Sequence, residues 1–385
     1  MIPRLISPLP GHSFFLFGAR GTGKSTFLDE FFKDSTTIWI DLLDPEQEDR
    51  YARNPSELRQ QIAANRESLE WVVIDEVQKV PKLLDVVHAV VEKENIRFAL
   101  TGSSARRLKK DTVNLLAGRA FVYNLFPFTH QELGSNFDLD QALQFGTLPT
   151  LFSLNNEKEY QTYLRAYSLT YLKEEVWAEH LIRKLDPFRR FLEIAAQSNG
   201  EIINYSNIAA DVGADHKTVA SYFEILEDTL LGFVLEPFHH SLRKRQLKSP
   251  KFFFFDPGVV RALTRMLTVA LKSKTYAYGR AFEHFVIVEI IRLSSYHQKD
   301  FRFSYLNTKD GVEIDLIVER PGQRTALIEI KSTTQVSERD IRQLARFKKD
   351  LPFSEAFCLS QDPVKKQING VLALPWEEGI KALGL

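Results

Sequence analysis

The sequence has no excess of charge of one sign, which excludes a general electrostatic attraction to other molecules. Fifty acidic residues balance fifty basic ones in a chain of 385. No overall field therefore draws the protein toward nucleic acid or membrane, and any such attraction must come from local patches.

Cysteine is almost absent. The one cysteine, Cys358, excludes an internal disulfide and fits a reducing compartment. It lies in an apolar, strand-like run, so we expect a buried side chain rather than a nucleophile.

Long hydrophobic runs are missing near the start of the chain. The apolar run at residues 14–17 is too short for the core of a signal peptide or for a membrane span. We therefore expect a cytoplasmic protein with no membrane partner. The length, with 44% hydrophobic and 26% charged residues, is typical of two or three globular domains.

Residues 1–135 alternate short apolar runs with helical patterns. Runs typical of strands occur at residues 13–17, 37–40, 71–74, 98–100 and 120–125. This alternation predicts a parallel sheet with helices on both faces. A helical connector at residues 136–186 follows, with its helix ending before Asp186-Pro187.

Residues 187–250 show the pattern of three helices and a strand. Helical patterns occur at 188–197, 206–213 and 215–231, and a strand-like run follows at 232–235. Ser206 is expected to cap the second helix, Gly213 to end it and Asp215 to cap the third. This order predicts a winged helix-turn-helix. Residues 251–385 predict a final α/β region, with a helix at about 279–293 and strands at 301–306, 313–318 and 326–330.

Residues 18–25 read Gly-Ala-Arg-Gly-Thr-Gly-Lys-Ser and match G-x-x-x-x-G-K-[ST] in full, between a strand and a helix. The glycines let backbone N–H groups close around phosphates, and the helix adds its positive N-terminal end. Lys24 would neutralise the β- and γ-phosphates, and the Ser25 hydroxyl would ligate Mg²⁺. The sequence therefore predicts that ATP and Mg²⁺ bind here. The residues expected at the nucleotide are Gly18, Ala19, Arg20, Gly21, Thr22, Gly23, Lys24, Ser25 and Thr26.

Two acids end the apolar run at residues 71–74, and they supply the complementary half of the site. Asp75 and Glu76 emerge at the carboxyl end of a strand, where open α/β sheets bind ligands. Asp75 would hold Mg²⁺, directly or through water, and Glu76 would polarise the attacking water as a general base. Combined with the phosphate loop, this pair predicts ATP hydrolysis.

Two polar positions complete the predicted site, and each has a second interpretation. Thr101, with Ser103 and Ser104 after the strand at 98–100, would sense the γ-phosphate, or the segment is a turn with a serine cap. Arg119 would reach a neighbouring subunit's phosphate as an arginine finger, or it is a surface arginine at a helix end. Arg20 and Arg106 are rival candidates for that role.

These motifs resemble the AAA+ superfamily, and more closely the prokaryotic group of predicted ATPases that joins an AAA domain to a C-terminal domain of unknown function. The matching stretches are residues 18–25, 74–81, 100–104, 116–119, 146–149, 248–251, 255–258 and 279–283. The resemblance covers nearly the whole chain. It implies an AAA+ fold, a winged helix, a nuclease-like C-terminal domain and self-association into an oligomer, of which a hexamer is one form.

The expected fold class is accordingly α/β. It consists of an AAA+ P-loop parallel sheet at residues 1–135, a helical connector at 136–186, a winged helix-turn-helix domain at 187–250 and a nuclease-like α/β domain at 251–385.

Acidic residues on two consecutive predicted strands resemble the PD-(D/E)xK nuclease signature, with Asp315 on the first strand and Glu329-Ile330-Lys331 on the second. Because side chains alternate across a strand, Glu329 and Lys331 project from the same face. Asp315 and Glu329 would share Mg²⁺, and Lys331 would orient or activate the attacking water. Glu283, on the preceding helix, would complete the metal site.

The proline of that signature is absent, because Glu313-Ile314 precede the acid. Three interpretations therefore stay open: an intact metal-binding nuclease site, a degenerate nuclease fold and an unrelated sheet.

Two groups of residues are candidates for contact with DNA. The start of the helix at 215–231, the part of a recognition helix that meets base edges, carries His216, Lys217, Thr218 and Ser221. The acid-free segment at 241–251 would contact phosphates through Arg243, Lys244, Arg245 and Lys248. Winged helices also bind proteins and basic loops are often only solvated, so both alternatives stay open.

These features favour an ATP-hydrolysing factor that acts on DNA through a winged helix, with a C-terminal domain that binds or cuts the DNA. The alternative is an ATP-gated switch or scaffold for a protein partner, with a degenerate, non-cleaving nuclease-like domain.

Overall fold

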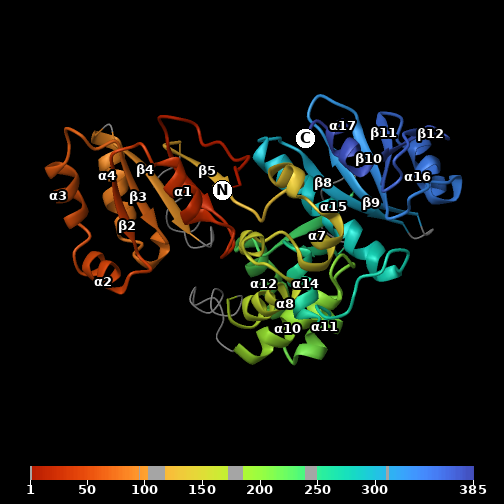
Figure 1. Ribbon diagram of the computed structural model, residues 1–385, viewed down its shortest axis with the longest axis horizontal. Coiled ribbons are helices and arrows are strands. Elements are labelled where there is room, and N and C mark those ends of the chain that lie inside the picture. The colour runs from red at the N-terminus through yellow and green to blue at the C-terminus, as the bar shows by residue number, and fades with distance from the viewer. Residues whose placement is uncertain (1, 95, 103–117, 172–184, 239–248, 309–311) are drawn as a thin grey trace.

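The computed structural model describes residues 2–94, 96–102, 118–171, 185–238, 249–308 and 312–385. Seven of the predicted functional positions lie outside these residues: Ser103, Ser104, Arg106, Arg243, Lys244, Arg245 and Lys248. Figure 1 shows one sheet at each end of the long axis and a helical region beside them. Within the described residues, no helix is both long and apolar enough to cross a membrane.

The first sheet has five parallel strands in the order β2-β3-β4-β1-β5. The strands are β1 (Ser13–Phe17), β2 (Thr37–Asp41), β3 (Trp71–Asp75), β4 (Arg97–Gly102) and β5 (Ala120–Asn124). Between them lie α1 (Lys24–Phe31), α2 (Pro45–Arg53), α3 (Glu57–Ala64), the 3₁₀ turn η1 (Val77–Lys79) and α4 (Leu83–Lys93). The predicted parallel sheet is confirmed.

Alternating side chains of this sheet bury two separate cores, one on each face. Phe14 packs in one core with Leu28 of α1. Phe15 packs in the other with Ile62 of α3 and Leu84 of α4. Helices therefore cover both faces, which leaves the carboxyl ends of the strands as the edge where a site can form.

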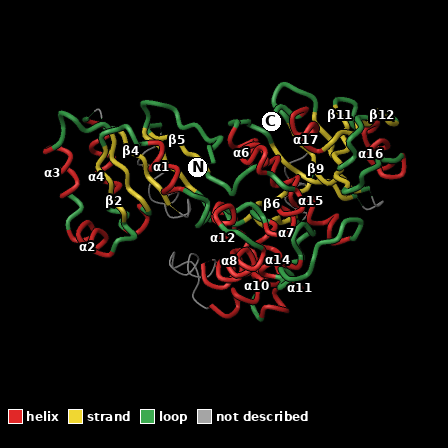
Figure 2. The backbone as a smooth tube through the Cα atoms, in the orientation of Figure 1, coloured by secondary structure: helices red, strands yellow, loops and turns green. Residues whose placement is uncertain are grey.

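A helical region follows (Figure 2). Its elements are α6 (His130–Leu133), η2 (Gly134–Asn136), α7 (Leu139–Phe145), η3 (Pro149–Ser153), α8 (Glu157–Ala166), the π-helical turn η4 (Tyr167–Tyr171), α10 (Leu185–Gln197), α11 (Tyr205–Val212), α12 (His216–Asp228) and α14 (Pro257–Leu263). One aromatic-rich core joins most of them and includes Phe188, Phe223 and Phe255.

Of the two predicted N-terminal caps, that of α12 is confirmed and that of α11 is wrong. Asp215 caps α12 as predicted, because its carboxylate accepts hydrogen bonds from the backbone N–H groups of Lys217 at 2.9 Å and Thr218 at 3.0 Å. Ser206 does not cap α11. The helix begins one residue before it, and Asn204 is the cap.

The second sheet is mixed and has eight strands in the order β12-β13-β11-β10-β9-β8-β6-β7. The strands are β6 (Gly232–Pro237), β7 (Lys251–Phe254), β8 (Arg302–Asn307), β9 (Glu313–Glu319), β10 (Thr325–Lys331), β11 (Ser354–Ser360), β12 (Lys366–Ile368) and β13 (Val371–Pro375). The core on one face includes residues of α15 (Tyr276–Tyr296) and α17 (Trp376–Ala382), and the core on the other includes residues of α16 (Glu338–Asp350). Cys358 of β11 is fully buried, and burial raises the pKa of its thiol to about 12.

The strand expected at the end of the three-helix segment belongs to this second sheet. β6 pairs antiparallel with β7, and its end at Glu236 and Pro237 pairs parallel with β8. The boundary expected at residue 250 thus falls between two paired strands. The expected domain boundaries stay predictions.

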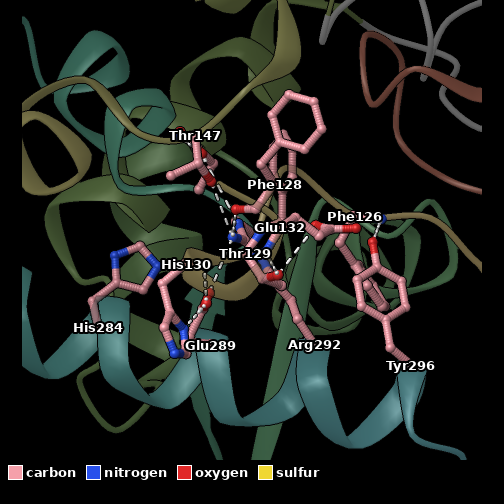
Figure 3. Close-up of polar contacts among 12 residues, drawn as sticks. Phe126, Phe128, Thr129, His130, Glu132, Thr147, His284, Glu289, Arg292 and Tyr296 are labelled. Atoms are coloured by element: carbon pink, nitrogen blue, oxygen red, sulfur yellow. Dashed lines mark hydrogen bonds and ion pairs between the residues drawn. The ribbon is translucent and has the colours of Figure 1, made fainter. Parts of the chain in front are cut away.

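A buried polar junction joins α15 to loops that are distant in the chain (Figure 3). Arg292 of α15 donates to the Thr147 hydroxyl at 3.1 Å and to the Phe255 carbonyl. Asp256, 3.9 Å from the Arg292 guanidinium, accepts from the Thr147 N–H at 2.8 Å and from the Gly258 N–H at 2.9 Å. Burial raises the pKa of Asp256, and the Arg292 charge opposes that effect. Two of the stretches that carry the resemblance, at 146–149 and 255–258, therefore meet at this junction.

Candidate functional site

The phosphate loop connects β1 to α1 at the carboxyl edge of the first sheet. Gly21 and Gly23 adopt φ angles of 77° and 90°, which favour glycine. Gly18 leaves no room for a side chain, because a Cβ there would lie 2.5 Å from the Leu125 carbonyl oxygen. The glycines of the motif are therefore required by the shape of the loop itself.

Three polar side chains meet where α1 begins and where β3 and β4 end. The Ser25 hydroxyl donates to Asp75 Oδ2 at 2.9 Å, and the Thr101 hydroxyl donates to Asp75 Oδ1. Thr101 also accepts from the Glu76 backbone N–H at 3.0 Å. The structure thus brings the predicted metal ligands, the general base and Thr101 together beside the phosphate loop.

Lys24 and Glu76 face each other across the same site. The Lys24 ammonium donates to the Gly18 carbonyl at 2.8 Å and lies 3.8 Å from Glu76 Oε1. Both side chains are largely buried, with 8% and 15% of their surface exposed. A cation and a carboxylate at the mouth of a phosphate loop are the groups that phosphoryl transfer requires.

The donor set at this site fits Mg²⁺. Ser25 and Asp75 offer a hydroxyl and a carboxylate, the oxygen ligands that this ion takes in nucleotide sites. These two side chains would hold the ion, which supplies charge neutralisation for a triphosphate when it is bound.

Two contacts hold the phosphate loop from outside the first sheet. The Tyr167 hydroxyl of η4 donates to the Arg20 carbonyl at 2.7 Å. The Arg4 guanidinium lies 3.4 Å from the Thr22 carbonyl, donates to the Tyr296 hydroxyl at 2.8 Å and lies 3.0 Å from the Glu132 carboxylate. The loop backbone is therefore linked to the helical region and to the end of α15.

Arg119 lies at the opposite edge of the sheet from its own phosphate loop. It precedes β5, which starts beside Ser13, whereas the loop follows Phe17 at the other end of the parallel pair. Its guanidinium lies 2.7 Å from Glu92 and 2.6 Å from His88, both on α4. Arg119 is therefore placed away from the phosphate loop of its own subunit, and as an arginine finger it would have to act on the nucleotide of a neighbouring subunit. The finger role stays a prediction. The rival Arg20 lies within the loop.

The second candidate site is an acidic cluster on the eight-stranded sheet. β10 carries Glu329 and Lys331, whose ammonium lies 2.5 Å from Glu329 Oε1. Asp315 of the neighbouring β9 accepts from the Ile330 N–H at 2.7 Å. Glu329 Oε2 is buried without a hydrogen-bond partner among the described residues.

Burial and mutual repulsion raise the pKa values of the carboxylic acids in this cluster. Burial, with the Asp315 charge added, raises the pKa of Glu329 to about 8 and that of Glu283 on α15 to about 7. Burial also raises the pKa of Asp315. Burial opposes the charged form of Lys331, but Asp315 and Glu329 together raise its pKa. Titratable groups with shifted pKa values are thus gathered in a buried place, which is typical of functional sites.

Lys251 is a member of this cluster that sequence analysis placed only at the end of the basic run. Its ammonium lies 2.9 Å from Glu313, and its charge partly offsets the rise that burial causes in the pKa of both Glu283 and Asp315. In the sequence, the signal for burial was that Lys251 directly precedes the apolar run at residues 252–255, and the structure leaves Lys251 4% exposed.

The metal assignment at the cluster stays a prediction. In the part of the chain that the structure describes, no group of three or more His, Cys, Asp or Glu side chains could hold a metal ion. Glu329 Oε2, which has no hydrogen-bond partner in the described part of the chain, belongs to a carboxyl whose pKa burial and the Asp315 charge raise, and it nevertheless fits a cation held by these two carboxylates.

The cluster predicts a dependence of stability on pH. The folded protein keeps the Glu283 proton up to a pH of about 7, whereas the reference pKa is 4.5, so stability falls as pH rises between these values. Because glutamine does not ionise, Glu283→Gln should stabilise the protein by about 1–3 kcal/mol at pH 8 and by little at pH 4.5. Denaturant unfolding at both pH values measures this. Glu67→Gln, in an exposed loop, is the control, and equal stability of wild type and Glu283→Gln at pH 8 would contradict the prediction.

The residues proposed to read DNA bases differ in exposure. His216 and Lys217 are exposed in the first turn of α12. The Thr218 hydroxyl donates to Asp215 Oδ2 at 2.6 Å and so belongs to the cap, and Ser221 is half-buried. The structure therefore offers two of the four for direct contact.

Comparison with known families divides the chain into three parts. Residues 11–134 match an AAA domain. Residues 136–269 and 278–378 match two domains of unknown function, DUF8612 and DUF4143. The chain thus carries an AAA-type ATPase domain, which implies ATP binding.

Similar proteins are themselves uncharacterized. One from Mycobacterium tuberculosis is 26% identical over 310 residues, which cover 78% of this chain and 69% of that protein. One from Methanocaldococcus jannaschii is 23% identical over an alignment of 415 positions, gaps included. The alignment covers 94% of this chain and 83% of that protein.

Solved structures match more weakly. A Walker-type ATPase of Pyrococcus abyssi has a TM-score of 0.43 at 14% identity and covers 65% of this chain and 90% of its own. The Aeropyrum pernix ORC1 protein, in complex with DNA, has a TM-score of 0.28 at 12% identity and covers 66% and 86%. Likenesses of this size carry no argument about function.

Proposed function

We propose that this chain, which carries an AAA domain at residues 11–134, hydrolyses ATP and uses the reaction to act on DNA. The observation that carries the ATPase part is the junction of Ser25, Asp75 and Thr101 beside the facing pair Lys24 and Glu76. A structural role for these polar groups would not require a glycine loop that exposes backbone N–H groups next to them.

In this proposal each residue has one task. The loop N–H groups and Lys24 bind the phosphates, and Ser25 and Asp75 hold Mg²⁺. Glu76 accepts a proton from the attacking water while the water oxygen bonds to the γ-phosphorus and ADP leaves with the bridging oxygen. Thr101, which is hydrogen-bonded to Asp75, links the end of β4 to the Mg²⁺ ligand, so that loss of the γ-phosphate would displace this end of β4.

The DNA part rests on the exposed start of α12 and on the basic segment that connects the paired strands β6 and β7. In a winged helix these would be the recognition helix and the wing. His216 and Lys217 would meet the grooves, and Arg243, Lys244, Arg245 and Lys248 would neutralise phosphates.

Replacing Arg243, Lys244 and Arg245 together by glutamine should weaken binding to DNA. Each lost phosphate contact removes roughly 0.9 from the slope of log affinity against log salt. Fluorescence anisotropy with linear, forked and four-way DNA, at several salt concentrations and with and without ATP, measures this. Glutamine at Arg53, Arg59 and Arg66, three exposed arginines of the first domain, is the matched control.

Wild-type and variant binding that is equally weak and independent of salt would refute the DNA role. If ATP turnover persisted in that case, the result would favour an ATP-gated switch or scaffold for a protein partner.

The acidic cluster supports a second candidate activity, metal-dependent cleavage of the bound DNA. The observation that favours it is a buried Glu329 oxygen beside Lys331 and Asp315 that has no hydrogen-bond partner within the described ranges. The same DNA panel with Mg²⁺ or Mn²⁺ tests it: cutting should occur with wild type and be lost in Asp315→Asn, while DNA binding and ATP turnover remain. Equal cutting by both proteins would exclude this site.

A further inference from the structure

Gln78 lies in the turn that follows the acidic strand end, and its side chain reaches back to the proposed general base. β3 ends at Asp75, and the 3₁₀ turn η1 begins at Val77. Between them Glu76 adopts φ 58° and ψ 47°, a left-handed conformation that is uncommon outside glycine. This conformation folds the chain back within two residues, and Gln78 Nε2 donates to Glu76 Oε2.

Both oxygens of the Glu76 carboxylate are therefore engaged, and by groups of different kinds. Oε1 lies 3.8 Å from the Lys24 ammonium. Oε2 accepts a hydrogen bond from the Gln78 amide, and Gln78 is only 5% exposed. Lys24 is the residue that moves to the phosphates when a triphosphate occupies such a loop, so its contact with Oε1 is the one that ATP would release.

The other end of the Gln78 amide lies against the end of β4. A Cβ added to Gly102 would lie 2.7 Å from Gln78 Oε1, so glycine leaves the space in which the amide lies. Gly102 directly follows Thr101, which bonds to Asp75 and to the Glu76 N–H. The Gln78 amide thus lies between the end of β4 and the Glu76 carboxylate.

We infer that Gln78 is a positioning residue for the hydrolysis reaction, which rests on the ATPase activity proposed above. Its amide fixes Glu76 Oε2 and so leaves Oε1 as the oxygen that takes the proton from water. The same amide transmits a displacement of β4 to the base.

Gln78→Met keeps the length and burial of the side chain and removes the amide. A hydrogen bond to a charged group has a strength that corresponds to a loss of roughly 10- to 100-fold in kcat. We expect that loss, with the Kd for a fluorescent ATP analogue changed less than about threefold because Gln78 does not touch the phosphates. Gly102→Ala moves the amide without removing it and should lower kcat in the same direction.

Gln144→Met is the matched control. Gln144 of α7 also uses its amide locally, donating to the Leu267 carbonyl at 3.1 Å and accepting from the Leu271 N–H at 3.0 Å, and none of these groups belongs to the first sheet. Its kcat should stay at the wild-type value.

A double variant separates positioning from a general structural effect. Because Gln78 acts through Glu76, Gln78→Met should have no further effect on the residual turnover of Glu76→Gln. The same 10- to 100-fold loss in that background, or a wild-type kcat for Gln78→Met alone, would overturn the inference. Absence of ATP turnover in the wild-type protein would instead refute the proposed function, so the two failures are distinguishable.

Discussion

Glu76→Gln should keep ATP binding and lose turnover by on the order of 10²- to 10⁴-fold, the contribution of a positioned general base. Glutamine has the shape of glutamate, so the contact with the Gln78 amide is retained, but it cannot accept the proton from water. Nucleotide-dependent heat stabilisation should persist, and steady-state phosphate release should fall.

Lys24→Ala is the companion variant. It removes the charge that neutralises the phosphates, so both the heat stabilisation and the turnover should be lost. Retained turnover in Lys24→Ala would refute the assignment of the loop, and unchanged turnover in Glu76→Gln would refute the assignment of the base. Glu48→Gln, which removes a surface ion pair with Lys79, is the control.

Gly146→Ala should cause a large loss of stability for the addition of a single methyl group. Gly146 adopts φ 78° and ψ −165°, a conformation essentially restricted to glycine. A Cβ there would lie 1.9 Å from Asp256 Oδ1 inside the buried junction. Backbone strain and overpacking together should lower the free energy of unfolding by about 3–5 kcal/mol.

Gly213→Ala is a comparison variant in which both causes are weaker, because Gly213 adopts the left-handed αL conformation that other residues can adopt at modest cost. Gly213 also has a positive φ, 73°, but nothing lies within 4 Å of a Cβ there, so its loss should be about 1 kcal/mol. Thermal unfolding followed by circular dichroism compares the two variants. Equal melting temperatures for Gly146→Ala and Gly213→Ala would contradict the expected combination of backbone strain and overpacking at Gly146.

The first sheet was predictable because its strands are buried on both faces and read as continuous apolar runs. Residues 71–74 have no polar side chain, and Asp75 then marks the carboxyl edge. The pairing of Ser25 with Asp75 follows from the same geometry, since a phosphate loop and a strand end meet at one edge of a parallel sheet.

Local ambiguity explains the errors at helix starts. Asn204 and Ser206 are both good caps, and the choice depends on which one reaches a free N–H group. The helix expected to end before Asp186-Pro187 is followed by α10, which begins at Leu185 and includes Pro187. Proline is tolerated in the first turn, where its missing N–H is not needed.

Long-range pairing explains what the sequence did not reveal. The pairing of β6 with β8 joins Glu236 to Ser304 across a wide separation in the chain, and no local pattern encodes it. Lys251 enters the acidic cluster through that sheet, so its electrostatic role became visible only when β7 was in place.

The hold of Tyr167 and Arg4 on the phosphate loop has a thermodynamic consequence for the rest of the molecule. The guanidinium near the Thr22 carbonyl also binds the Tyr296 hydroxyl at the end of α15, so a rearrangement of the loop alters the surroundings of that helix. Binding equilibria linked in this way are reciprocal. If ATP raises the affinity of the C-terminal half for a partner by some factor, that partner must raise the affinity for ATP by the same factor. Titrating either one in the presence of the other would measure this coupling.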